Sequence, residues 1–380
     1  MIGVVTMVLT DSLSVGMIRQ MLTNQIGADA GYIQIHKKGY QENPTLKNSI
    51  PDPGEVRAVL EKDARSCNIS ERLRTFGLVS SANNSSGVAI VGVTPQSEKR
   101  VTTICKYIVN GAYLSGNTDE AIISTSTADK LKVGIGDKVV IMASRLDGSV
   151  GSEACRVVGI FETFDSGFDQ SHVYIPLQTA QQMVGAQGRI SEFVINPADA
   201  KRTDPIADKI RSDLPGEFEV LTFKQMLPLL VMQMQLYNET IYIFYAIIAI
   251  ALIFGIVNTM LMAVMERTHE FGVDMAIGMS NKRIFIMVLV EALYLGVVGT
   301  TIGFLVSFAI YVPLSYSGWN LAMFSESLKW LGVGTIIYPT LTVSSLTNAI
   351  MVIPTATVIG AIYPALRAVK LQPYEAIRAT

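Results

Sequence analysis

Charged residues, histidines and cysteines are all scarce in this chain. Asp, Glu, Lys and Arg together make up 16% of the 380 residues, whereas hydrophobic residues make up 49%. Soluble domains usually carry about 25% charged residues, and the mean hydropathy here is +0.37. This composition favours a membrane protein and excludes a disordered chain. The net charge of −2 excludes a basic nucleic-acid-binding protein.

The few cysteines and histidines are scattered along the chain. There is no Cys-x-x-Cys pair and no histidine at the spacing of a metal ligand, so we expect no metal site. One disulfide and three free thiols both fit the odd cysteine count. These residues are Cys67, Cys105, Cys155, His36, His172 and His269.

The sequence also lacks the common catalytic motifs. It contains no GxxxxGK[ST], GxSxG, HExxH or GxGxxG pattern. We therefore expect no ATP bound through a P-loop and no other cofactor in this chain. No pair of a nucleophile and a base can be argued from spacing, so a membrane-anchored enzyme is the weakest of the functions considered.

The charges that are present lie mostly in the first part of the chain. Residues 1–239 hold 49 of them, and the 141 residues from Thr240 onward hold 13. Three long apolar stretches in the second part are each able to cross a membrane, which takes about 20 residues. We expect these spans near 240–265, 284–313 and 348–366.

A fourth apolar stretch stands at the start of the chain. Met1–Leu9 reaches only about 13 Å as a helix and lacks the basic leader of a signal peptide. We interpret residues 1–27 as a partial first span followed by a helical stalk; a very short anchor is the alternative.

Basic residues near the helix ends predict the orientation. They gather in the segment between the second and third spans and again after the last span, which the positive-inside tendency assigns to the cytoplasm. Residues of about 25–235 then lie outside, and 314–347 form a short outer loop. The basic residues are Arg267, Lys282, Arg283, Arg367, Lys370 and Arg378.

The outer domain has the pattern of a mixed α+β fold. Short alternating or apolar runs predict strands, and amphipathic runs between them predict helices. The strands are expected at 31–36, 88–93, 121–124, 136–142, 155–161, 173–175, 193–195 and 218–221. The helices are expected at 53–63, 127–132, 177–184 and 204–212.

The cytoplasmic segment 266–283 mixes charged and apolar residues. It suits either a solvated connector or a short helix that docks on a cytosolic partner. The residues that would carry docking are Glu266, Arg267, Glu270, Phe271, Gly272, Met275, Ile277 and Gly278.

Glu291 lies about 10 Å along the third span from Ile284. An ionisable group at membrane depth is a functional candidate. We favour the alternative that Glu291 lies near the headgroups and pairs with Lys282 or Arg283.

The same span carries Gly296, Gly299 and Gly303, a small-residue face of the kind that lets helices pack closely. Gly255 and Gly360 are candidates for the same role.

Several of these motifs together resemble one permease family. The stretches that carry the resemblance are 258–264, 266–268, 270–272, 276–278 and 291–292, together with a C-terminal signature formed by Pro364, Arg367, Pro373, Glu375 and Arg378. The chain is similar over essentially its whole length to the ABC transporter permeases of macrolide exporters, lipoprotein-releasing complexes and the cell-division permease.

The resemblance implies a four-span α-helical membrane protein of the bacterial inner membrane, with an extracytoplasmic domain inserted between spans 1 and 2. That domain would consist of a porter-like part (28–95 and 191–222) and an inserted β-rich part (96–188), followed by a transmembrane domain (223–380). In the family, segment 266–283 carries a coupling helix on a separate ATPase dimer, which binds ATP and Mg, and two identical or paralogous permeases pair.

The family implies a non-catalytic subunit that couples ATP hydrolysis to the extraction or export of an amphiphile such as a lipoprotein, lipid, peptide or drug. Residues 31–40 are more similar to the lipoprotein-releasing branch. The alternative is a cell-division-type permease that regulates a periplasmic hydrolase and transports nothing.

Overall fold

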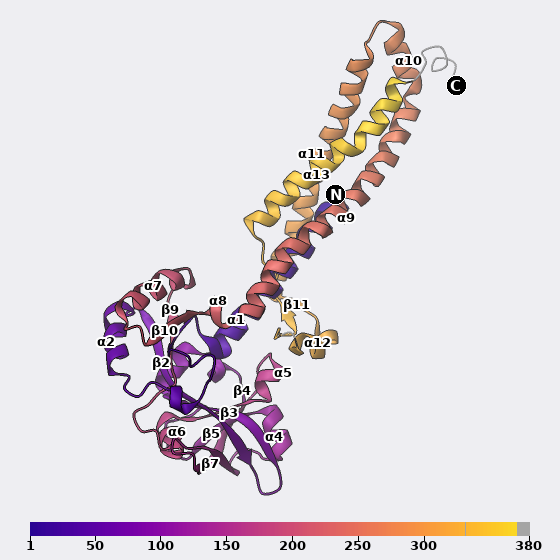
Figure 1. Cartoon of the computed structure of the whole chain (residues 1–380). Coiled ribbons are helices and arrows are strands. Elements are labelled where there is room, and N and C mark those ends of the chain that lie inside the picture. The colour runs from indigo at the N-terminus through magenta and orange to yellow at the C-terminus, as the bar shows by residue number, and fades with distance from the viewer. Residues whose placement is uncertain (331, 371–380) are drawn as a thin grey trace. The chain divides into compact units, whose positions relative to one another are not determined.

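The computed structural model describes residues 1–330 and 332–370, and Figure 1 labels most of their helices and strands. The chain divides into two compact units. The membrane unit comprises Met1–Gln20, Met232–Ala322 and the chain from Ile336 onward, and the outer unit comprises Met21–Val231 and Met323–Thr335.

Within residues 1–330 and 332–370, four helices are long and apolar enough to cross a membrane, as the sequence predicts. They are α1 (Ile2–Gln25), α9 (Pro228–Glu266), α11 (Asn281–Ser317) and α13 (Val343–Val369). The three spans expected in the second part lie inside the last three helices, which extend beyond them at both ends. At the N-terminus, the apolar start and the expected stalk form one continuous helix.

Small residues let the helices of the membrane unit approach closely. A Cβ atom on Gly296 would lie 2.9 Å from Cγ2 of Thr357 on α13, and one on Gly303 would lie 2.6 Å from Cβ of Val4 on α1. Both distances are shorter than van der Waals contact, so α11 packs against α13 and α1 only because these residues are glycines. A Cβ atom on Gly299 would meet nothing nearer than 3.7 Å.

The other two glycines named from the sequence differ from each other. A Cβ atom on Gly360 would lie 3.2 Å from Ile256, whereas one on Gly255 would meet nothing within 4 Å. Only Gly360 therefore lies at a close helix contact.

The outer unit is built on one ten-stranded mixed sheet. Its strand order is β10-β1-β9-β2-β3-β8-β5-β7-β4, and β6 pairs with β2 and β7. The strands are β1 (Ile33–Lys37), β2 (Cys67–Ser80), β3 (Ser85–Val93), β4 (Ile108–Gly111), β5 (Glu120–Ser124), β6 (Lys138–Ser144), β7 (Val150–Phe161), β8 (His172–Pro176), β9 (Glu192–Pro197) and β10 (Phe218–Thr222).

Helices pack on this sheet around separate apolar cores. One core joins β1, β9 and β10 to two helices through Ile35, Leu60 and Ile210. A second core lies among β2, β3, β5, β6 and β7 and includes Ile90, Ile141 and Val157. The helices are α2 (Gly54–Asp63), α3 (Pro95–Val101), α4 (Thr125–Leu131), α5 (Ser166–Asp169), α6 (Leu177–Val184), α7 (Thr203–Asp213) and α8 (Phe223–Met226).

The longest strand, β2, was not expected from the sequence. Its residues 67–72 pair with β9 and its residues 77–80 pair with β6, so the two expected parts of the outer domain share one sheet. Charged residues at Glu71, Arg72 and Arg74 interrupt the apolar alternation of β2, which is why its pattern does not predict a strand.

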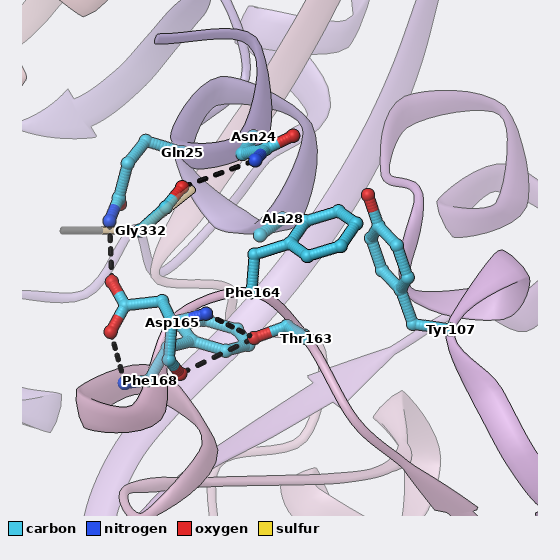
Figure 2. A pocket seen from close by; sticks show the side chains of 9 residues that line it. All are labelled: Asn24, Gln25, Ala28, Tyr107, Thr163, Phe164, Asp165, Phe168 and Gly332. Carbon is cyan, nitrogen blue, oxygen red and sulfur yellow. Dashed lines mark hydrogen bonds between the residues drawn. The ribbon is translucent and has the colours of Figure 1, made fainter. Parts of the chain in front are cut away.

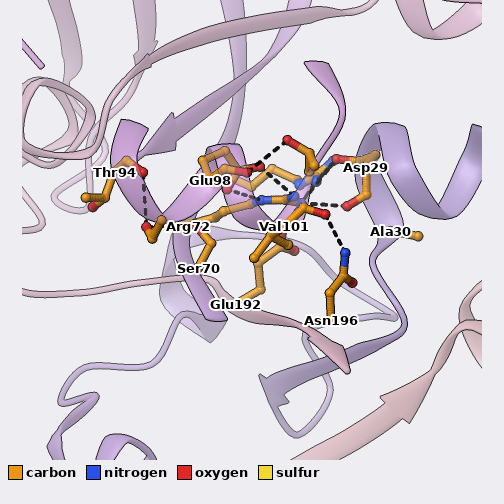
Figure 3. Close-up of polar contacts among 12 residues, drawn as sticks. Asp29, Ala30, Ser70, Arg72, Thr94, Glu98, Val101, Glu192 and Asn196 are labelled. Carbon is orange, nitrogen blue, oxygen red and sulfur yellow. Dashed lines mark hydrogen bonds and ion pairs between the residues drawn. The ribbon is translucent and has the colours of Figure 1, made fainter. Parts of the chain in front are cut away.

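Arg72 forms the centre of a buried ion cluster in the outer unit (Figure 3). Its side chain has no exposed surface. Its Nη2 lies 2.8 Å from Glu98, and its Nη1 lies 3.1 Å from Glu192 and 3.3 Å from Asp29. Arg74 adds ion pairs to Asp29 at 2.6 Å and to Glu192 at 3.2 Å. Burial alone would raise the pKa of Glu192, but Arg74 and Arg72 outweigh it and hold that pKa below its usual value.

Part of the connection between α11 and α13 belongs to the outer unit. This connection contains β11 (Trp319–Asn320), α12 (Ser325–Trp330) and β12 (Ile336–Ile337). Lys329 pairs with Glu162 at 2.6 Å, and Asn24 Nδ2 donates to the carbonyl of Gly332 at 3.1 Å. Beside this contact, Gln25 Nε2 donates to Asp165 Oδ2 at 2.6 Å (Figure 2). The expected outer loop is therefore fastened to the outer unit.

Candidate functional site

The candidate coupling segment is the turn of chain between α9 and α11. It contains one short helix, α10 (Thr268–Ala276), which follows Arg267 directly. Gly278 has a φ of +101°, a left-handed conformation that favours glycine, and it turns the chain toward Ser280 at the start of α11. The sequence thus produces a short helix with a sharp turn on its far side.

Phe271 fastens α10 to the long helices. Its side chain is 1% exposed and lies in an apolar cluster with Met260 and Val264 of α9 and Ile284 and Val288 of α11. Burying a phenylalanine stabilises a fold by about 1.5–3 kcal/mol. Its role is therefore internal, and the expectation that its ring presents surface to a partner is wrong.

The side chain of Arg267, the residue directly before α10, pairs with Glu270 of α10 and with Glu291 of α11. Arg267 Nε donates to Glu270 Oε2 at 2.8 Å, and its Nη1 lies 3.0 Å from Glu291 Oε2. The partner of Glu291 is therefore Arg267, and the expected pairing with Lys282 or Arg283 is wrong. Arg267 and Glu291 lie side by side because the chain reverses direction between α9 and α11. The spacing of residues along α11 alone cannot predict this pair.

The exposed side of the segment is both acidic and apolar. Ile277 is 77% exposed and Val273 is 41% exposed. Met275 is half-buried in the cluster around Phe271, and Gly272 is buried. His269 is exposed on α10 and was not singled out from the sequence. The exposed residues are Glu266, His269, Glu270, Val273, Ala276, Ile277 and Gly278.

The described part of the C-terminal signature lies near this segment in the membrane unit. Pro364 is buried inside α13, and Arg367 is exposed, with its Nε donating to the Tyr363 hydroxyl at 3.3 Å. Pro373, Glu375 and Arg378 lie outside the described residues. A cleft of about 440 Å³ opens beside Arg367 between α9 and α13. It is lined by Val264, Met265, Tyr363, Leu366, Arg367 and Lys370.

The geometry suits mechanical contact. Within residues 1–330 and 332–370, no group of three or more His, Cys, Asp or Glu side chains is arranged to hold a metal ion. Val273 of α10 and Ile277 just after it are free to contact a protein surface, while Phe271 and Arg267 hold the helix to α9 and α11.

Two family models match the chain. The MacB-like periplasmic core domain matches residues 1–213, and the FtsX-like permease C-terminal domain matches residues 242–373. The first covers more than half of the chain and contains most of the outer domain, and the second contains α10 and α11.

Curated relatives agree with these models. The lipoprotein-releasing system transmembrane protein LolE of Haemophilus influenzae is 23% identical over 84% of this chain and 79% of its own length. The macrolide export ATP-binding/permease protein MacB 2 of Yersinia pestis bv. Antiqua is 26% identical over 68% of this chain and 36% of its own. The probable syringafactin export ATP-binding/permease protein SyfD of Pseudomonas syringae is 26% identical over 60% of this chain and 34% of its own.

Among solved structures, the periplasmic region of MacB from Actinobacillus actinomycetemcomitans aligns with 53% of this chain and 93% of its own. The TM-score is 0.38 and the identity is 13%, so this similarity carries no further argument.

The four apolar helices and the family matches indicate a multipass inner-membrane protein with a periplasmic domain between its first and second spans. The fold predicted from the sequence is thereby confirmed. The chain belongs to the family of ABC transporter permeases of the MacB, LolE and FtsX type.

Proposed function

We propose that this chain is the non-catalytic permease subunit of an ABC transporter and couples ATP hydrolysis by a separate ATPase dimer to the extraction or export of an amphiphile. The ATPase would bind ATP and Mg, and a second permease, identical or paralogous, would complete the complex. The observation that carries the proposal is the structure of the coupling segment. One side of α10 is exposed and is both acidic and apolar, and its other side packs against α9 and α11 through Phe271.

The fastening makes α10 suitable for transmitting force. A push on Ile277 or Val273 acts on a helix whose Phe271 side chain is enclosed by α9 and α11. A partner that moves α10 would therefore move the ends of both long helices together. The helix α9 then continues without a break to Pro228 at the outer domain, a length of about 58 Å.

The division of labour is supported by the sequence and by the relatives. The chain has no P-loop motif, and it spans about a third of the length of the relatives named as ATP-binding/permease proteins. We infer that ATP is bound and hydrolysed outside these 380 residues.

An amphiphilic substrate is supported by what the relatives are named for. Their names specify lipoprotein release, syringafactin export and macrolide export. A lipoprotein carries both a lipid anchor and a polar polypeptide, which fits extraction of an amphiphile at a membrane surface by an outer domain.

Stimulation of the ATPase tests the coupling. The full chain is purified with its ATPase in nanodiscs, and the variant Ile277→Ser is compared with Ile135→Ser, the same substitution at a 41% exposed isoleucine of the outer unit. We expect Ile277→Ser to lower the stimulated rate and the co-purified ATPase by about tenfold, which corresponds to roughly 1.4 kcal/mol of lost contact. Equal rates for the two variants would refute a docking role for this face.

A further inference from the structure

One edge of the outer sheet is left open beside β3. The strand β3 pairs with β2 along its whole length, from Ser85 to Val93. Its parallel ladder with β8 begins only at Ala89. Within the described part of the chain, residues 85–88 therefore have a strand on one side only.

The backbone of Gly87 faces this open edge. The amide of Arg74 donates to Ser191 Oγ at 2.9 Å, so the backbone groups of Arg74 point away from β3. Along an antiparallel pair, the backbone N–H and C=O groups of successive residues point alternately toward and away from the partner strand. The backbone groups of Leu78 therefore also point away from β3, and those of Gly87, which lies opposite Leu78, point away from β2. Consistently, Ala89, two residues further, donates to the carbonyl of Ser171.

An open cleft of about 590 Å³ adjoins this edge. Phe76 is 58% exposed and Leu78 is 47% exposed on the same face of the sheet. Directly opposite them stand Ala89 and Gly87, and a Cβ atom on Gly87 would meet nothing within 4 Å. Large apolar side chains beside small ones leave room for a further side chain.

The polar groups of the cleft include both donors and acceptors. Arg74 Nη2 is occupied by Asp29 and Glu192, but its buried Nε has no partner among the described residues. On the opposite wall, His172 Nδ1 lies 3.0 Å from the carbonyl oxygen of Phe168, which can only accept, so Nδ1 carries the hydrogen.

The net charge of the cleft indicates which kind of ligand can bind there. Burial lowers the pKa of His172, so its ring is neutral near pH 7 and its Nε2 is an acceptor. The charge of Arg74 is balanced by Asp29 and Glu192. A neutral ligand with alternating N–H and C=O groups fits such a surface better than an anionic headgroup, and polypeptide backbone has those groups.

We propose that an extended segment of a client polypeptide adds to residues 85–88 of β3 as an extra strand and places one side chain against Phe76 and Leu78. Main-chain hydrogen bonds would supply affinity, and the apolar side chains would supply selectivity. The free edge is about 13 Å long. A segment of that length buries too little surface for a stable dimer interface, which needs about 800 Å² per partner. A short linear segment is therefore the expected occupant. This inference does not depend on the coupling proposed above.

Peptide binding to the full chain tests the proposal. The probe is a fluorescein-labelled octapeptide of alternating threonine and valine, and binding to the protein in detergent micelles is followed by fluorescence anisotropy. Gly87→Pro removes the edge N–H without taking a bond from the β2 ladder, and Gly87→Ala keeps that N–H and its Cβ enters open space. We expect Gly87→Pro to weaken binding by about tenfold and Gly87→Ala by less than about twofold.

A second probe keeps the test independent of how the variant folds. The same octapeptide with alternate backbone amides methylated cannot complete the ladder, so its binding to the unaltered protein should fall by about tenfold as well. The proposal is overturned if the unmodified peptide gives no anisotropy change at about 1 mM protein, or if both probes bind equally well. Self-association that Gly87→Pro abolishes, without peptide binding, would assign the edge to a second copy and also overturn it.

Discussion

Replacing Arg72 by methionine should destabilise the outer domain more than most single substitutions in it. The methionine fills a similar volume but leaves Glu98 buried with no cation beside it, since Glu98 pairs only with Arg72 among the described residues. Glu192 and Asp29 retain Arg74. One uncompensated buried carboxylate costs about 3–5 kcal/mol, a large part of the 5–15 kcal/mol that stabilises a typical domain.

Hydrogen exchange followed by mass spectrometry measures this effect in the full chain. Peptides from β2 and α3 report the free energy of opening of the cluster, whereas tryptophan fluorescence does not, because neither Trp319 nor Trp330 lies in β2 or α3. We expect protection in both elements to fall by about 3–5 kcal/mol in Arg72→Met.

A double variant separates the charge effect from a packing effect. In Arg72→Met/Glu98→Gln the buried charge is gone, so at least half of the lost protection should return. A loss below about 1 kcal/mol in the single variant, or no recovery in the double variant, would refute the assignment of this cluster as a buried charge network.

Three further outcomes follow from the structure. Gly303→Ala should lower the melting temperature in micelles by several degrees, because its Cβ atom would lie 2.6 Å from Val4, whereas Gly299→Ala should leave it unchanged. Glu291→Gln should cost about 1 kcal/mol or less of protection in α10, because both side chains of its pair with Arg267 are about 40% exposed; a larger loss would mean that the pair is effectively buried. The pKa of Glu192 is below its ordinary value of 4.5 in the folded state, so its contribution to stability is complete above pH 4.5 and is lost as the pH falls toward the folded pKa. Exchange protection of β9 should thus be constant from pH 7 to 5 and fall below about pH 4, and a fall between pH 7 and 5 would contradict this sign.

The membrane architecture could be predicted because it depends on composition over long windows. The 26 residues of 240–265 contain no charge and lie inside α9. Helices in lipid must satisfy their backbone internally, so a long uncharged run leaves few other structures open to it.

The interior of the outer domain could not be predicted in the same way. Arg72 is buried only because Asp29, Glu98 and Glu192, which are far apart in the sequence, converge on it. Without those partners, a charge in the middle of β2 indicates an exposed segment. The strand was missed for the same reason.

The sequence places a short segment at 266–283 between two spans, as the structure has it, but the two faces of its helix could not be told apart. The mixed character of α10 and of Ile277 just after it does not show whether Phe271 or Ile277 faces inward, and the packing of α9 against α11 decides it. Glu291 and Arg267 are 24 residues apart, so their pairing depends on the turn at Gly278.

We propose that ATP hydrolysis by a partner is coupled through α10 to the release of an amphiphile. The most direct measurement follows ATP hydrolysis and the release of a lipid-anchored protein together, in proteoliposomes that contain the chain and its ATPase. We expect ATP-dependent release that Ile277→Ser reduces in parallel with hydrolysis and that Ile135→Ser leaves intact. Hydrolysis stimulated by the chain without any release, together with binding of a periplasmic hydrolase, would contradict the account and favour a regulator that transports nothing.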